Sequence, residues 1–102
     1  MLFRSQRTPA APELPTVAES GVPDYAASLW YGLLAPARTP RDIIMRLHDD
    51  VAKVLALPDV RERLAGQGVD PLVSTPDEFA KLIATDLDKW AKVVKTSGAR
   101  ID

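Results

Sequence analysis

The eight residues from Ser28 to Ala35 constrain the fold more than any other part of the chain, because they are mainly apolar and carry no charge. A run this short and this apolar is typical of a strand buried on both faces, as in the mostly parallel sheet of an α/β protein. Pro36 ends the run, since proline has no N–H for a strand ladder. A buried strand needs a neighbour on each side for its backbone groups. The sequence therefore predicts a strand over Ser28–Ala35 inside a sheet.

Two Thr-Pro pairs predict the starts of two long helices. Thr39 precedes Pro40, and Thr75 precedes Pro76. In each pair the threonine side chain can accept a hydrogen bond from a first-turn amide, and the proline is preset for the first helical position. Glu78, three residues after Thr75, completes a capping box. Apolar residues then recur at helical spacing, which predicts two amphipathic helices. The apolar positions are Ile43, Ile44, Leu47, Val51, Val54 and Leu55, and Phe79, Leu82, Ile83, Leu87, Trp90, Val93 and Val94.

Proline and glycine set the remaining boundaries. Pro58 ends the first long helix and opens a short helix over about Pro58–Gly66, with Gly68 as its stop. Gly98 closes the last helix. The apolar stretch Val69–Val73 predicts a short strand, and the proline inside it favours an edge position.

The resulting order is a βααβα pattern, which favours an α/β layer in which helices dominate. Two strands are too few for a stable sheet, which normally needs three or more. We therefore expect residues 14–102 to form a single α/β segment that lacks some of its partner strands. Residues 1–13, with two prolines and no periodic pattern, are expected to be extended or disordered.

The composition argues against several classes of function. A net charge of −1 leaves no footprint for nucleic acid, and no apolar run approaches the roughly 18–20 residues of a membrane helix. The chain has no cysteine, which excludes disulfides, thiol catalysis and thiolate metal ligands. It has one histidine and no fingerprint of a nucleotide or phosphate site. We expect no metal, no cofactor and no enzyme activity.

Individual polar residues have structural interpretations that outweigh functional ones. His48 lies at the margin of an apolar stripe, where a partly exposed surface histidine is the ordinary case. Asp49 and Asp50 point about 100° apart on a helix and so do not converge on a metal. Ser28 starts the predicted buried strand, but it has no nucleophile elbow around it and only His48 to serve as a base.

Several segments, in this order, resemble the C-terminal third of the periplasmic solute receptors of tripartite tricarboxylate transporters, the Bordetella-uptake type. The matching segments are Leu14–Pro23 (LPTVAESGVP), Trp30–Pro36 (WYGLLAP), Thr39-Pro40, Pro58–Leu64 (PDVRERL) and Ser74–Phe79 (STPDEF), and the similarity continues to Trp90. The resemblance covers nearly all of the chain from about Leu14.

This resemblance implies a βααβα portion of a periplasmic-binding-protein (Venus-flytrap) fold, in which two lobes close on a ligand. It implies a small carboxylate ligand, membrane transporter subunits as partners and a periplasmic location. Trp30 and Tyr31 alternate across the predicted strand, which is consistent with plain core packing. The resemblance places Ser28, Trp30 and Tyr31 near a strand that crosses between the lobes, so these three are the candidate ligand-binding residues.

Two hypotheses remain open at this point. In the first, the chain is part of a carboxylate receptor and does not bind ligand alone, because most of the binding groups lie in segments it lacks. In the second, it is a structural remnant that buries its open strand edges against another copy as a homo-oligomer. The N-terminal residues lack the apolar core of a signal peptide. A truncated reading frame, a cloned piece and a proteolytic remainder each explain that departure from the family.

Overall fold

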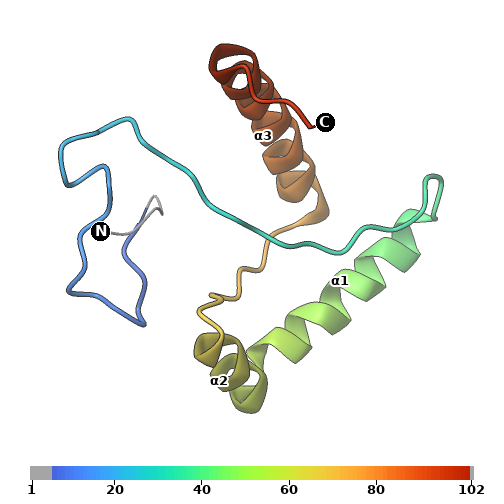
Figure 1. Cartoon of the computed structure of the whole chain (residues 1–102). Coiled ribbons are helices and arrows are strands. Elements are labelled where there is room, and N and C mark those ends of the chain that lie inside the picture. Colours follow the sequence, from blue (N-terminus) through green and yellow to red (C-terminus); the bar gives the residue numbers. More distant parts are fainter. Residues whose placement is uncertain (1–5, 102) are drawn as a thin grey trace. The chain divides into compact units, whose positions relative to one another are not determined.

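The computed structural model describes residues 6–101 and contains three helices (Figure 1). Helix α1 spans Arg41–Ala56, α2 spans Pro58–Gly66 and α3 spans Pro76–Ser97. All three predicted helices are therefore confirmed, with boundaries close to those expected. Of the predicted N-terminal stretch over residues 1–13, the first five residues lie outside the described part of the chain. Residues 8–14 make turns, with Ala11 N–H donating to the Thr8 carbonyl at 3.1 Å and Leu14 N–H to the Ala11 carbonyl at 3.2 Å.

The capping residues of α3 act as their sequence spacing predicts. The Thr75 hydroxyl accepts from the Glu78 N–H at 3.1 Å, and the Glu78 carboxylate accepts from the Thr75 N–H at 3.1 Å. These reciprocal bonds satisfy two donors that a helix start otherwise leaves open. At the other end Gly98 has a φ of +69°, and its N–H donates to the Val94 carbonyl at 3.0 Å. Both ends of α3 are thus fixed by local chemistry.

Helix α2 ends in two nested backbone hydrogen bonds. The Gly68 N–H donates to the Ala65 carbonyl at 3.0 Å, and the Val69 N–H donates to the Leu64 carbonyl at 2.9 Å. This is the Schellman arrangement, which requires a left-handed residue after the helix. Gly68 supplies it with a φ of +71°.

The two predicted strands are not formed. Neither Ser28–Ala35 nor Val69–Val73 has regular structure, and within residues 6–101 the only bridge assignment is an isolated one at Thr16. A strand persists only where a neighbour pairs with its backbone groups, and the described residues provide no such neighbour. The expectation that helices dominate is therefore confirmed, whereas the two strands of the expected α/β βααβα pattern are not seen in residues 6–101, which are helical with long irregular connections.

The chain divides into two compact units, which we describe separately. The first comprises Met1–Arg38 and Ala56–Pro71 and contains α2. Its described residues include the two buried side chains of the structure, Thr16 at 2% exposure and Val17 at 7%. The Thr8 hydroxyl donates to the Asp70 carboxylate at 3.3 Å, which joins the start of this unit to the stretch after α2.

The second unit comprises Thr39–Leu55 and Leu72–Asp102, and so contains nearly all of α1 and the whole of α3. The apolar stripes predicted from sequence are present on both helices, but neither helix contains a buried residue. The prediction of amphipathic helices specified the stripes and not what would cover them, and in the described residues the stripes stay at least partly exposed. None of the helices in the described residues has the length and apolar character that crossing a membrane demands.

Candidate functional site

The three candidate ligand-binding residues lie on one irregular stretch of the first unit. We call residues 25–36 the open segment; Figure 1 draws it as a long loop, blue-green in the sequence colouring, that contains no helix. Ser28 and Tyr31 are exposed, and Trp30 retains 37% of its exposure. These three residues are neighbours because they are close in sequence. Their proposed role in ligand binding stays a prediction.

The open segment displays apolar side chains rather than burying them. Their exposures are 84% for Leu29, 82% for Tyr31, 79% for Leu33 and 78% for Leu34. Scattered exposed apolar residues are normal on a protein surface, but consecutive large ones usually mark an interaction surface. The open segment thus has the apolar composition of a buried element, but its side chains are exposed to solvent.

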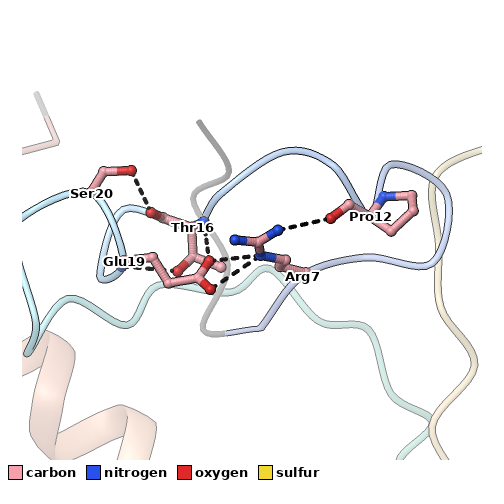
Figure 2. A network of polar contacts seen from close by, with 5 residues as sticks. All are labelled: Arg7, Pro12, Thr16, Glu19 and Ser20. Atoms are coloured by element: carbon pink, nitrogen blue, oxygen red, sulfur yellow. Dashed lines mark hydrogen bonds and ion pairs between the residues drawn. The ribbon is translucent and has the colours of Figure 1, made fainter.

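A polar network organises the turn that leads into the open segment (Figure 2). The Thr16 hydroxyl accepts from the Glu19 N–H at 3.2 Å, and the Glu19 carboxylate accepts from the Thr16 N–H at 2.8 Å. This is the reciprocal pattern of a capping box, here closing one turn without a following helix. The Ser20 hydroxyl donates to the Thr16 carbonyl at 2.8 Å. The network explains why Thr16, although polar, can be buried.

Arg7 connects this turn to the residues before it. Its Nε donates to both oxygens of Glu19, at 3.1 and 3.0 Å, and its Nη1 donates to the Pro12 carbonyl at 3.1 Å. The side-chain hydrogen bond from Arg7, followed by the backbone hydrogen bond from Thr16, lowers the pKa of Glu19 to about 2. Glu19 therefore stays ionised near neutral pH and acts as a structural anion, not as a general acid.

Sequence reasoning missed the partners of Thr16. The signal for Glu19 was present, because Thr16 and Glu19 have the spacing of a capping box. The contact with Arg7 had no comparable signal, since the two charged residues are twelve positions apart and no helix or strand fixes their approach.

His48 is partly exposed, as expected from the sequence, and its ring also makes two contacts that the sequence did not predict. Its side chain is 24% exposed, with Nδ1 3.0 Å from the Asp49 carboxylate and Nε2 2.8 Å from the Ser74 carbonyl. The hydrogen bond to Asp49 is the largest cause of a raised pKa, the bond to the Ser74 carbonyl adds to it, and partial burial opposes it. Both ring nitrogens are engaged, so neither is available to activate a nucleophile. No cluster of three or more potential metal ligands occurs within residues 6–101.

Comparisons with known proteins show a family of related sequences that matches nearly the whole chain. The family described as "Tripartite tricarboxylate transporter family receptor" matches residues 2–99. The protein named BugT of Bordetella pertussis is 36% identical over 100 residues, which are 98% of this chain and 31% of that protein. A protein encoded in the tcbD-tcbE intergenic region of Pseudomonas sp. strain P51 is 36% identical over 89 residues, 86% of this chain and 26% of that protein. The chain thus spans about a third of the length of these relatives, in keeping with the portion that its sequence resembles.

Proposed function

The chain belongs to the tripartite tricarboxylate transporter receptor family, and from this premise we propose that it is a C-terminal portion of a periplasmic solute-binding receptor. The intact receptor holds a small carboxylate between two lobes and presents it to the membrane subunits of the transporter. The family consists of transport receptors and not of enzymes, and we propose no bond-making or bond-breaking step. In the intact receptor the fold is that of a periplasmic binding protein.

The observation that carries this proposal is the exposure of the open segment. Burying a large apolar side chain stabilises a protein by about 1.5–3 kcal/mol relative to leaving it in water. Most of that stabilisation is absent for three leucines that are each at least 78% exposed, Leu29, Leu33 and Leu34. A chain with so much uncovered apolar surface is expected to be covered by further protein in its working form. The remaining two-thirds of a family receptor would supply the neighbouring strands.

The three candidate binding residues have chemistry suited to the edge of such a cleft. The hydroxyls of Ser28 and Tyr31 can donate hydrogen bonds to a carboxylate, and the ring of Trp30 can form an apolar wall. Carboxylate binding in clefts of this kind also uses backbone amides, helix N-termini and ordered water. Because most of those groups would come from outside this chain, we expect the isolated chain to bind carboxylates weakly or not at all.

A chimera tests this proposal directly. The first two-thirds of a longer family receptor would be joined to this chain, and calorimetry with a panel of di- and tricarboxylates would compare the chimera with the chain alone. We expect binding by the chimera only. Ser28→Ala and Tyr31→Phe in the chimera should weaken binding, whereas Ser97→Ala, the same hydroxyl loss at the end of α3, should not. Micromolar affinity of the chain alone, or no effect of the first two substitutions, would count against the assignment.

Self-association is the second candidate, and the same exposed side chains favour it. A second copy of the chain could cover Leu29, Leu33 and Leu34 as a homo-oligomer with no ligand-binding role. Size-exclusion chromatography with light scattering separates the two candidates. A dimer that persists at low micromolar concentration supports self-association, whereas a monomer that binds only when fused to the rest of a receptor supports the first candidate.

A further inference from the structure

His48 faces two hydrogen-bond acceptors that come from different parts of the second unit. Nδ1 lies 3.0 Å from the carboxylate of Asp49, the next residue on α1, and Nε2 lies 2.8 Å from the carbonyl oxygen of Ser74. A neutral imidazole has one N–H, so it can donate a hydrogen bond to only one of these oxygens. The other oxygen then faces the lone pair of the unprotonated ring nitrogen, and no hydrogen bond forms there. The protonated ring has two N–H groups and satisfies both. The geometry therefore selects the charged form.

The carbonyl that His48 reaches belongs to a structurally sensitive position. Ser74 immediately precedes Thr75, the N-cap of α3, whose hydroxyl and N–H are both used in the capping box with Glu78. A hydrogen bond to the Ser74 carbonyl therefore ties the middle of α1 to the backbone from which α3 begins. The bond spans 26 positions of sequence, so it is a tertiary contact and not a local one.

Asp49 is the charged group that shifts the pKa of the His48 ring. On the α3 side, Asp77 pairs with Arg41 and the carboxylate of Glu78 accepts from the Thr75 N–H. Asp49 is the charged residue that both hydrogen-bonds to His48 and attracts it electrostatically. The contact accordingly joins a titrating ring, the largely exposed carboxylate of Asp49 and a backbone carbonyl.

We propose that His48 is a pH-sensitive latch, which in its doubly protonated form fastens α1 to the start of α3 and which loosens when the ring loses a proton. The direction follows from linkage. The pKa of His48 in the folded chain is raised above its ordinary value of 6.5, so folding is favoured by proton binding. The latch contributes fully below about pH 6.5, and its contribution is lost as the pH rises through the raised pKa.

The chain offers an unusually clean test, because His48 is its only histidine. The ring signals in an NMR titration of the full chain therefore report this residue alone. We expect its midpoint to lie above that of the same chain in urea, and Asp49→Asn to move it down. Asp50→Asn is the matched control: it removes the same charge from the next residue of α1, which is not among the groups acting on the ring, and should leave the midpoint much less changed.

A second readout separates a latch from a merely titrating surface residue. The carbonyl ¹³C shift of Ser74 should change with the same midpoint as the His48 ring, and this change should be absent in His48→Gln. The urea midpoint of the wild-type chain should fall between pH 5 and pH 8 by more than that of His48→Gln. Equal midpoints for the folded and urea-unfolded ring, or a Ser74 carbonyl that does not follow the titration, would overturn the proposal. Should His48→Gln fail to fold, the wild-type carbonyl titration still decides.

Discussion

Arg41 and Asp77 form a two-bonded ion pair between the first turns of α1 and α3. Nη1 of Arg41 donates to Oδ1 of Asp77 at 3.3 Å, and Nη2 donates to Oδ2 at 3.2 Å. The planar guanidinium matches a carboxylate in this geometry, which a lysine does not reproduce. Both side chains are nevertheless largely exposed, at 66% and 74%, so water and salt screen the attraction. The ion pair therefore contributes a specific geometry between Arg41 and Asp77 but little to the free energy of unfolding.

We therefore expect a small coupling energy between these two residues. In a double-mutant cycle of Arg41→Gln and Asp77→Asn, the coupling should be less than about 1 kcal/mol and should shrink in high salt. Urea unfolding followed by helical circular dichroism measures it. Arg46→Gln is the control, because it removes the same charge from an exposed position of α1. A coupling well above 1 kcal/mol at high salt would show that the pair is less accessible to water than its exposure indicates.

The end of α2 allows two glycine substitutions with opposite effects. Gly66 is helical, so alanine should stabilise the chain by up to about 1 kcal/mol. Gly68 has a φ of +71°, where an L-residue costs roughly 1–2 kcal/mol, so alanine there should destabilise it. An added Cβ has no neighbour within 4 Å at either position. Steric clashes therefore do not contribute to the difference in stability between the two variants.

Urea midpoints of Gly66→Ala and Gly68→Ala measure this difference in sign. Each variant is the control for the other, because both add one methyl group within three residues of the same helix end. Two changes of the same sign would mean that the Schellman arrangement does not govern how α2 ends.

Loss of the Thr75 hydroxyl should weaken the start of α3. Thr75→Ala removes the acceptor for the Glu78 N–H, and N-cap losses of this kind cost about 0.5–2 kcal/mol. Thr75→Ser keeps an acceptor and should cost less. Circular dichroism and amide exchange at Glu78 and Phe79 would register the effect. An unprotected Glu78 amide in the wild-type chain would instead indicate that the capping box does not form.

Glu19 should make the turn around Thr16 sensitive to strong acid. Its pKa is lowered to about 2 from 4.5, so its contribution to stability is present above pH 4.5 and is lost as the pH falls through about 2. NMR titration of the Glu19 side chain measures this directly. Arg7→Gln removes the largest cause and should raise the pKa toward 4.5, whereas Glu13→Gln, a nearby charge loss outside the network, should have little effect on it. An unchanged titration in Arg7→Gln would mean that the two side chains do not pair in solution.

Local signals account for what the sequence predicted well. The Thr75–Glu78 box, the Pro58 break and the Gly98 stop act through residues within one helical turn, so they function in whatever context the chain has. The strand over Ser28–Ala35 differs, because its hydrogen bonds need partners far away in sequence. The composition of that run predicted a buried element, but composition does not create neighbours, and the side chains of the run are exposed in the structure. The contact of the His48 ring with the Ser74 carbonyl was missed for the related reason that Ser74 approaches only through tertiary structure.

The open segment provides the sharpest distinction between a receptor portion and a self-sufficient fold. In the isolated chain we expect the amides of Leu29, Leu33 and Leu34 to exchange at nearly the rate of an unfolded peptide, because the described residues give them no strand partner. In the chimera with the rest of a family receptor, a neighbouring strand should protect the same amides by about 100-fold or more. The amides of Leu82 and Ile83 inside α3 are the control, since their hydrogen bonds lie within the helix and are present in both forms.

Two outcomes would contradict this expectation. If light scattering shows a dilute isolated chain to be monomeric and the open segment is still protected, the chain pairs this segment by itself. The receptor-portion proposal would then lose its main support. Protection that appears only as the chain is concentrated would instead favour a second copy as the cover for these side chains.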